Sequence, residues 1–242
     1  MSSYILRGVR RTDLKSNESA LKYFLLGSFS SAFLLYGIAL VYGVTRTTNL
    51  ELIGREIARG NVSAPVLYLS AALMLVGFGF KIAVAPFHIW VPDVYEGAPT
   101  PISAFMSVGP KAAGFAMLFR VFFEAFPALA NKWLVAAWIS SVLTMCAGNF
   151  AAIVQSNIKR MLAYSSIAHA GYILVAFVSG SQEGEAAALF YLLAYALMNI
   201  GAFALVTIVS GEGDKRVSIE DFAGIGTSHP ILAASMSIFL LS

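Results

Sequence analysis

The sequence has 242 residues, of which 58% are apolar and only 12% are charged, and its mean hydropathy is +0.76. A soluble domain carries about 25% charged residues, so the composition excludes a soluble globular protein and predicts one membrane domain spanning 1–242. The net charge of +3 does not indicate a nucleic-acid partner, because basic residues in membrane proteins mostly report orientation. With Cys146 as its single cysteine, the chain has no internal disulfide.

Six apolar segments are long enough to cross a bilayer as helices, which takes about 20 residues each. We expect these spans at about 20–44, 66–90, 101–126, 132–154, 158–179 and 186–210. Another apolar run starts at Pro230 and continues for about 13 residues, so we expect a truncated seventh span and interpret the chain as a fragment. The predicted fold class is therefore an all-α, polytopic transmembrane helix bundle.

A polar segment at 45–64 separates the first two expected spans. Within it Leu50, Ile53 and Ile57 recur at helical spacing, which predicts a short amphipathic helix in a surface loop. A second connecting segment, VPDVYEGAPTP, is short, acidic and proline-rich, and we expect it to form the loop between the second and third spans.

The basic residues predict the orientation. We call the face that holds residues 1–22 side A and the opposite face side B. The loops of side A carry nine basic residues and those of side B carry five: Arg7, Arg10, Arg11, Lys15, Lys22, Lys159, Arg160, Lys215 and Arg216 against Arg46, Arg55, Arg59, Arg120 and Lys132. Since cytoplasmic loops are enriched in Lys and Arg, we expect side A to be cytoplasmic.

Lys81 and Lys111 lie inside apolar runs, where a charged amine is costly and indicates function. At 1.5 Å per residue, Lys81 lies about 14 Å and Lys111 about 15 Å from side A. Because a hydrocarbon core is about 30 Å thick, both lysines are expected near the midplane. The alternative, an amine that reaches the headgroups, fails because a lysine side chain extends only roughly 6 Å.

A proline follows Lys81 and another precedes Lys111. Pro86 is expected to leave the carbonyl of Ile82 without its helical donor, and Pro110 to do the same for Met106. The pattern predicts a discontinuous helix near Lys81 and Pro86, and a broken helix beside an ionisable group is typical of ion carriers. The alternative is that these prolines only kink their helices.

Two further residues are candidates. His169 lies in the fifth span, about 18 Å from side A, although a histidine there can simply hydrogen-bond a neighbouring helix. Lys22 lies in the first turn of the first span, where depth alone indicates an interface anchor. His88 and His229 are weaker candidates, and no His, Cys, Asp or Glu cluster has metal-ligand spacing.

Three stretches of the sequence resemble a known family. The stretch KIAVAPFHIWVPDVYEGAPTPISAFMSVGPKAAGFAMLFRVF, with SNIKRMLAYSSIAHAGYIL and HPILAASMSIFLLS, resembles the subunit N (subunit 2) family of proton-pumping NADH:quinone oxidoreductase, respiratory complex I. The resemblance covers essentially the whole chain and corresponds to helices 6 to 12 of that antiporter-like fold. Its most specific part is the lysine motif with the PDVYEGAPTP loop.

The resemblance implies a role for each candidate. Lys81 resembles the central proton carrier on a broken helix, and Lys111 the lysine that passes protons sideways. Lys22 resembles a lysine that modulates the carrier, and His169 a histidine on the lateral polar axis. The glutamate that pairs with the carrier in this family, and a further lysine, have no counterpart within 1–242.

The resemblance also implies an activity and a setting. We expect a proton-translocating membrane subunit that moves protons through the midplane lysines, coupled to electron transfer from NADH to quinone in other subunits. The chain itself is expected to hold no cofactor, with NADH, FMN, the iron–sulfur clusters and quinone bound by partner subunits. The expected partners are other membrane subunits of complex I, the lipid bilayer and protons, in a bacterial inner membrane.

Two alternatives stay open. The first is a subunit of a Mrp-type cation/proton antiporter or of a membrane hydrogenase, which uses the same chemistry with other partners; the PDVYEGAPTP loop favours complex I. The second is a non-transporting membrane scaffold, in which removing the charges of Lys81 and Lys111 leaves activity intact.

Lys81, Lys111 and His169 lie at similar distances from side A. We therefore expect these three residues to face a shared hydrated interior at one depth.

Overall fold

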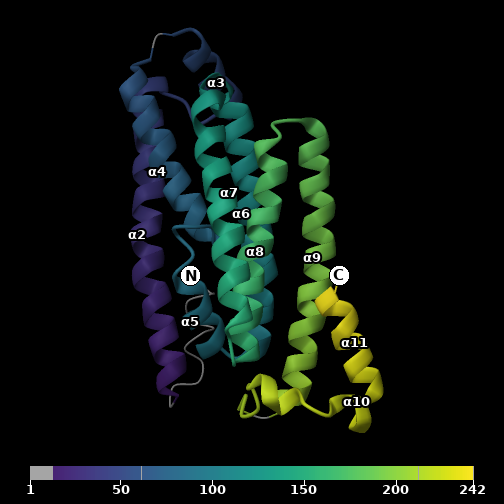
Figure 1. Ribbon diagram of the computed structural model, residues 1–242. Helices are drawn as coiled ribbons and strands as arrows, with labels where there is room; N and C mark the ends of the chain where they lie inside the picture. Colours follow the sequence, from purple (N-terminus) through teal and green to yellow (C-terminus); the bar gives the residue numbers. More distant parts are fainter. Residues whose placement is uncertain (1–12, 61, 212, 242) are drawn as a thin grey trace.

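The computed structural model describes residues 13–60, 62–211 and 213–241, and these fold into an all-α bundle (Figure 1). Within these ranges six helices are long and apolar enough to cross a membrane, which confirms the predicted fold class. Arg7, Arg10 and Arg11, which contribute to the expected basic excess of side A, lie outside the described residues.

The long helices run antiparallel to one another in chain order. They are α2 (Leu14–Thr45), α4 (Ala64–Ile82), α6 (Thr100–Ala125), α7 (Ala130–Ile153), α8 (Ile158–Val178) and α9 (Gln182–Ser210). The shorter elements are α3 (Leu50–Ala58), α5 (Trp90–Gly97), α10 (Ile225–Ser228), α11 (Pro230–Leu241), and the 3-10 turns η1 (Pro127–Leu129) and η2 (Ile219–Phe222). The apolar helix α11 occupies the run in which a truncated seventh span is expected.

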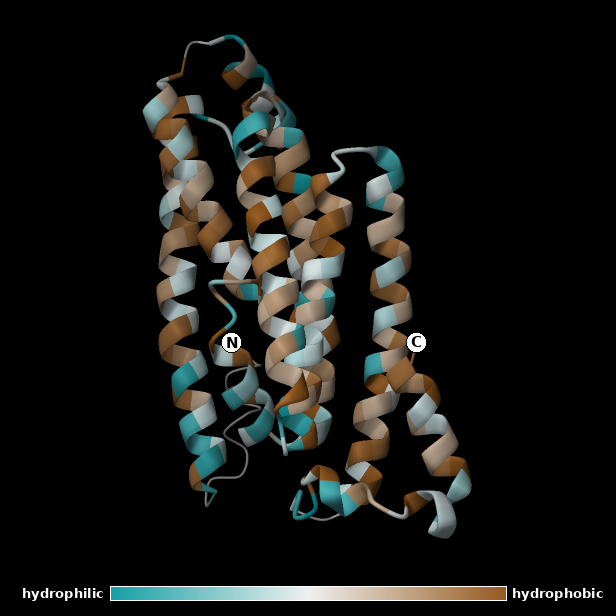
Figure 2. Ribbon diagram, viewed as in Figure 1, coloured by the Kyte–Doolittle hydropathy of each residue, from teal (hydrophilic) through white to brown (hydrophobic). Residues whose placement is uncertain are grey.

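Local sequence explains where several helices start. The side chain of Asp13 accepts from the backbone N–H of Lys15 at the start of α2, and Asn157 does the same for Lys159 and Arg160 at the start of α8. Such caps satisfy N–H groups that have no partner within the helix. Large apolar side chains are exposed on the bundle, among them Phe29 and Phe190, which are 67% and 74% exposed, as expected where the solvent is lipid. Hydrophobic residues recur along all the long helices (Figure 2).

The helix that carries Lys81 is discontinuous, as predicted. In Figure 1, α4 ends at mid-height and α5 continues below it after an irregular segment. The helix ends in a left-handed Ala83 (φ 64°), with Ala83 N–H donating to the Phe80 carbonyl (3.2 Å) and Val84 N–H to the Gly79 carbonyl (3.0 Å). This is a Schellman termination with alanine at the position that glycine usually holds.

The expected cause of that break is wrong. The helix has already ended at Ile82, so Pro86 does not remove a helical hydrogen bond from the Ile82 carbonyl. Pro86 lies instead within the irregular segment. Pro110 behaves differently, because α6 continues through it.

The connecting segment after Trp90 is also different from the expectation. Most of PDVYEGAPTP belongs to the helix α5 rather than to a loop. Pro92 is compatible with a helix because it lies in the first turn, where N–H groups have no helical partner. Val91, Val94 and Tyr95 are fully buried, since α5 packs between α2 and α8. Tertiary packing therefore outweighs the turn-forming composition of this stretch.

The helix α3 lies within the polar segment 45–64, at the side-B end of the bundle. Ile53 and Ile57 are 5% and 6% exposed, because they join the apolar core that also contains Phe126. Gly54 lies directly against the end of α6, where an added Cβ would approach the Glu124 carbonyl oxygen to 2.5 Å. The apolar side of this amphipathic helix therefore faces the bundle.

Candidate functional site

Lys111 lies near the middle of α6 and is only 2% exposed. Its Nζ donates to both the carbonyl oxygen and the Oγ of Ser166 on α8, each at 2.5 Å, and lies 5.4 Å from the centre of the Tyr195 ring on α9. Within the described residues no carboxylate lies within ion-pairing distance of this amine. Lys111 is thus a buried basic group whose partners are all neutral.

Lys111 and its neutral partners form a chain of hydrogen bonds through three helices, and the α6 backbone between Ser107 and Lys111 closes this chain into a loop. Tyr195 Oη donates to Ser166 Oγ (2.9 Å), and Asn199 Nδ2 donates to Tyr195 Oη (3.1 Å) and to Ser107 Oγ (2.5 Å). Ser107 and Lys111 lie one turn apart on α6, as Tyr195 and Asn199 do on α9, so each pair faces the same way. All five side chains are buried. We call this set the Lys111 loop.

His169 lies on the same helix as Ser166, one turn nearer side B. Its Nδ1 is 2.7 Å from Tyr191 Oη, and the centre of its ring is 5.2 Å from that of Tyr195 and 5.6 Å from that of Tyr172. Lys111 and His169 therefore both contact Tyr195. Two of the predicted site residues, 58 positions apart in the sequence, are brought together by this one side chain.

Lys81 lies in the last turn of α4, immediately before the break. Its backbone packs against Gly114 of α6, where an added Cβ would lie 3.6 Å from Lys81 Cβ. Gly114 is one turn from Lys111, so the two lysines lie on neighbouring helices at similar levels. The break also places Lys81 at a helix C-terminus, where the helix dipole presents partial negative charge.

Lys22 is placed apart from these residues, at the side-A end of α2. It is 43% exposed in its side chain and pairs with Glu18 (2.7 Å) and Asp93 (2.9 Å). Arg160 donates to Asp93 (2.8 Å) and to Glu96 (2.9 Å), and Glu96 also pairs with Lys15 (3.3 Å). We call these six residues the side-A cluster: Lys15, Glu18, Lys22, Asp93, Glu96 and Arg160.

A second ion pair on side A is buried. Lys159 is 2% exposed and donates to the Ala98 carbonyl (2.6 Å) and to Asp214 (3.4 Å). Asp214 in turn accepts from the backbone N–H (3.2 Å) and Oγ1 (2.8 Å) of Thr100. These bonds join the segment after α9 to the corner between α5 and α6.

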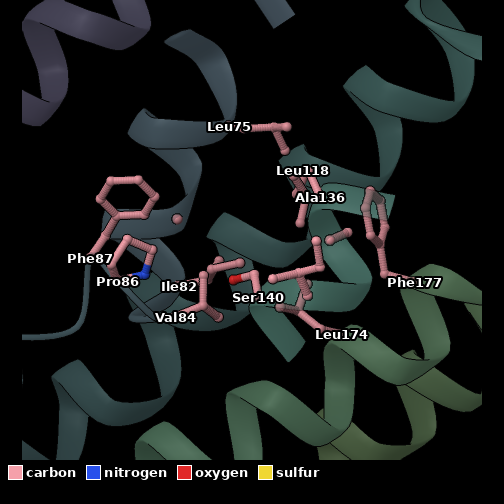
Figure 3. Close-up of a pocket in the computed structure, with 13 residues that line it drawn as sticks. Leu75, Ile82, Val84, Pro86, Phe87, Leu118, Ala136, Ser140, Leu174 and Phe177 are labelled. Atoms are coloured by element: carbon pink, nitrogen blue, oxygen red, sulfur yellow. The ribbon is translucent and has the colours of Figure 1, made fainter. Parts of the chain in front are cut away.

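A cavity of about 340 Å³ lies beside the break, but it lacks the chemistry of a proton path. Figure 3 shows Pro86 and Phe87 on one side of it and Leu174 and Phe177 of α8 on the other. The labelled polar side chain is Ser140, whose hydroxyl donates to the Ala85 carbonyl (2.6 Å). Apolar cavities of this kind stay dry.

The irregular segment is satisfied by neighbouring helices. Besides the Ser140 bond, Ala85 N–H donates to Thr144 Oγ1 of α7 (2.8 Å), and Trp90 Nε1 donates to the Phe80 carbonyl (3.2 Å). Non-helical backbone at membrane depth is tolerated where protein buries it in this way. The break is therefore a built feature of the bundle.

Sequence reasoning missed most of the Lys111 loop. Ser166, Tyr195, Asn199 and Ser107 are polar side chains in apolar spans, and the spacing of four between Tyr195 and Asn199 was a readable signal. The sequence does not reveal that these side chains face Lys111, because that depends on which helices are neighbours. Among the described residues, no group of three or more His, Cys, Asp or Glu side chains has the arrangement of a metal site.

Comparison with known protein families finds a match over the whole chain. The family described as "NADH:quinone oxidoreductase/Mrp antiporter, TM" matches residues 1–242. The chain is 54% identical over 242 residues to NADH-quinone oxidoreductase subunit N 1 of Solibacter usitatus, covering 100% of the chain and 50% of that protein. The chain thus spans about half the length of the curated relatives it matches.

Solved structures agree with this result. A chain in the structure of respiratory complex I from Thermus thermophilus with bound aureothin matches 99% of this chain and 50% of its own length, at TM-score 0.81 and 41% identity. A chain of the Mrp complex from Dietzia sp. matches 98% of this chain and 44% of its own length, at TM-score 0.87 but 22% identity, which shows a shared fold.

Proposed function

Because the chain belongs to the NADH:quinone oxidoreductase/Mrp antiporter family of transmembrane proteins, we propose that it conducts protons as part of a subunit N of respiratory complex I. In this proposal it carries the proton-translocating half of the reaction. Electrons pass from NADH to quinone in partner subunits that hold the FMN and iron–sulfur clusters. The identities of 54% and 41% to complex I proteins support that choice of complex.

The observation that carries the proposal is the environment of Lys111. A proton carrier has to be accommodated both as an ammonium and as a free amine. The Ser166 carbonyl accepts from either form, whereas the Ser166 hydroxyl accepts from the ammonium or donates to the amine. A carboxylate partner would instead hold the amine in its charged form, so neutral partners suit a group that gains and loses a proton.

In this proposal the other residues take the roles that the family resemblance implies. Lys81, at the break, is the central carrier. Lys111 passes protons sideways toward His169, and both of these residues lie against the ring of Tyr195. Lys22 acts on Lys81 indirectly, because its partner Asp93 lies on α5, the continuation of the broken helix. Side A faces the cytoplasm of a bacterium, whose inner membrane contains the bundle.

Two alternatives are less well supported. A subunit of a Mrp-type antiporter or a membrane hydrogenase would use the same lysines, but the likeness to the Mrp complex has 22% identity and carries only the fold. A non-transporting scaffold gives no reason for a buried amine that has no counter-ion among the described residues at the centre of the bundle, because burying such a group costs free energy.

The proposal is tested at Lys81 in the intact protein, assembled with its partner subunits in membrane vesicles. Lys81→Met keeps the length of the side chain and removes the amine, so we expect assembly to persist and proton pumping to fall at least about tenfold, since one carrier group is lost. Pumping is followed by quenching of a pH-sensitive dye and NADH oxidation is followed in parallel.

Lys81→Arg is the sharper variant. Arginine keeps the positive charge but does not release its proton, because its pKa lies above about 12. A purely electrostatic role survives this change, whereas a carrier role does not. Lys132→Met, which removes an exposed charge at the side-B end of α7, is the matched control. Normal pumping by both Lys81 variants would refute the proposal.

A further inference from the structure

The hydrogen atoms of the Lys111 loop have a fixed direction. Ser107 donates its hydroxyl hydrogen to the Ala104 carbonyl (2.7 Å), so its Oγ accepts from Asn199. Tyr195 has one hydroxyl hydrogen, which it donates to Ser166, so it too accepts from Asn199. The Asn199 amide nitrogen therefore faces both hydroxyls, and its two hydrogens prevent the Tyr195 hydroxyl from turning back toward it.

We propose that Tyr195, held in this direction by Asn199, is a positioning residue that adjusts the balance between the ammonium and free-amine forms of Lys111. This inference rests on the proposed function, because it concerns the same proton path. A hydroxyl that accepts a hydrogen bond becomes a better donor and a poorer acceptor through mutual polarisation. Tyr195 thus makes Ser166 a poorer acceptor for the ammonium and a better donor to the amine.

The geometry leaves Tyr195 well placed for this role. Its hydroxyl contacts Ser166, which is the residue that binds the Lys111 amine, while its ring faces both Lys111 and His169. Tyr195 is 2% exposed and Ser166 is fully buried, so bulk water does not compete for these bonds. In surroundings of low polarity, one hydrogen bond has a larger electrostatic effect than it has in water.

Other titratable groups around the Lys111 loop also act on Lys111 and have to stay unchanged in the test. The helix α3 packs only on the far end of α6, beside Glu124. The titratable groups nearest to the loop on the elements packed around it are Tyr95 on α5, His169 on α8 and Tyr191 on α9, and Lys81 on α4, whose Cβ lies near Gly114 of α6.

The test compares Tyr195→Phe with the unmodified protein in the same assembled complex and vesicles. Phenylalanine keeps the ring over Lys111 and removes only the hydroxyl. Ser166 then accepts better from the ammonium, so pumping persists to higher pH. We expect the decline of pumping at high pH to move up by about 0.5–1 pH unit, which corresponds to the net free energy that one hydrogen bond contributes. Tyr36→Phe, on the outer face of α2, is the matched control and leaves the profile in place.

A second variant decides the question if Tyr195→Phe does not assemble. Asn199→Leu has almost the same shape and adds no charge, but it lacks the two amide hydrogens, so Tyr195 is no longer held toward Ser166 and donates to it less strongly, and the profile moves in the same direction. An unmoved profile, or a move to lower pH, in the variant that assembles would overturn the inference.

Lys111→Met, measured alongside, separates the two claims. If it pumps normally, the proposed role of Lys111 in proton transfer fails. If it abolishes pumping while Tyr195→Phe and Asn199→Leu leave the pH profile unchanged, only the inference about Tyr195 fails.

Discussion

The Lys111 loop and the side-A cluster hold lysines in opposite electrostatic settings. Lys111 is 2% exposed and bonds to the carbonyl and the hydroxyl of Ser166, whereas the side chain of Lys22 is 43% exposed and pairs with two carboxylates. The first setting tolerates a change of protonation, and the second holds a permanent charge. The two lysines therefore differ in their partners as well as in their depth, and the partners decide how firmly each amine holds its proton.

Lys159 is an intermediate case. It is as buried as Lys111 but has the carboxylate of Asp214 as well as a carbonyl for partners. Burial of a charge is tolerated when it is paired and hydrogen-bonded, and the pair then fixes the position of the elements that carry it. Here those elements are the start of α8, the α5–α6 corner and the segment after α9. We interpret Lys159 as a structural cation.

The largest expected effect is a difference in proton pumping between the arginine variants of Lys111 and Lys22. Lys111→Arg should lower pumping at least about tenfold, because the guanidinium remains charged at all working pH values. Lys22→Arg should keep most of the activity, because arginine still pairs with Glu18 and Asp93. Dye quenching in vesicles with equal amounts of assembled complex measures both. Equal losses in the two variants would mean that their surroundings do not separate the two lysines.

A smaller effect, on stability, is expected for the buried pair. Lys159→Met leaves the carboxylate of Asp214 buried without its lysine partner, which costs about 3–5 kcal/mol for such pairs. We expect a lower melting temperature in detergent and less assembled complex. Lys215→Met removes an exposed lysine next to Asp214 and is the control. Equal melting temperatures for the two variants would contradict a structural role for Lys159.

The smallest effect is expected within the side-A cluster. The Lys15 side chain is 74% exposed in its pair with Glu96, and exposed ion pairs contribute about 0–1 kcal/mol. Lys15→Met should therefore change the melting temperature by no more than a few degrees, and the difference should shrink further in high salt because ions screen exposed charges. A loss as large as that of Lys159→Met would show that the whole cluster acts as one unit.

Sequence reasoning reached the spans, the break near Lys81 and the two lysines inside apolar helices, but not the partners of those lysines. The spans and the lysines are legible because helix length and apolar runs are local properties of the chain. The Lys111–Ser166 and Ser107–Asn199 bonds join residues 55 and 92 positions apart, so no local pattern contains them. The position of the break was approximated through Pro86, while its actual start at Ala83 goes with hydrogen bonds that Trp90 of α5 and Ser140 and Thr144 of α7 make around the break.

The sequence by itself determined that this is an all-α membrane bundle with ionisable groups inside its apolar helices, because composition and periodicity determine which segments prefer lipid. Tertiary structure alone decided that PDVYEG becomes the helix α5, since burial of Val91, Val94 and Tyr95 between α2 and α8 outweighs its loop-like composition. It also decided that Lys111 has neutral partners and that Lys22 has carboxylate partners. The Tyr195 hydroxyl bonds to Ser166, and the Tyr195 ring lies near both Lys111 and His169. The sequence shows which residues are lysines, but most of the groups that determine how firmly each lysine holds its proton lie on other helices.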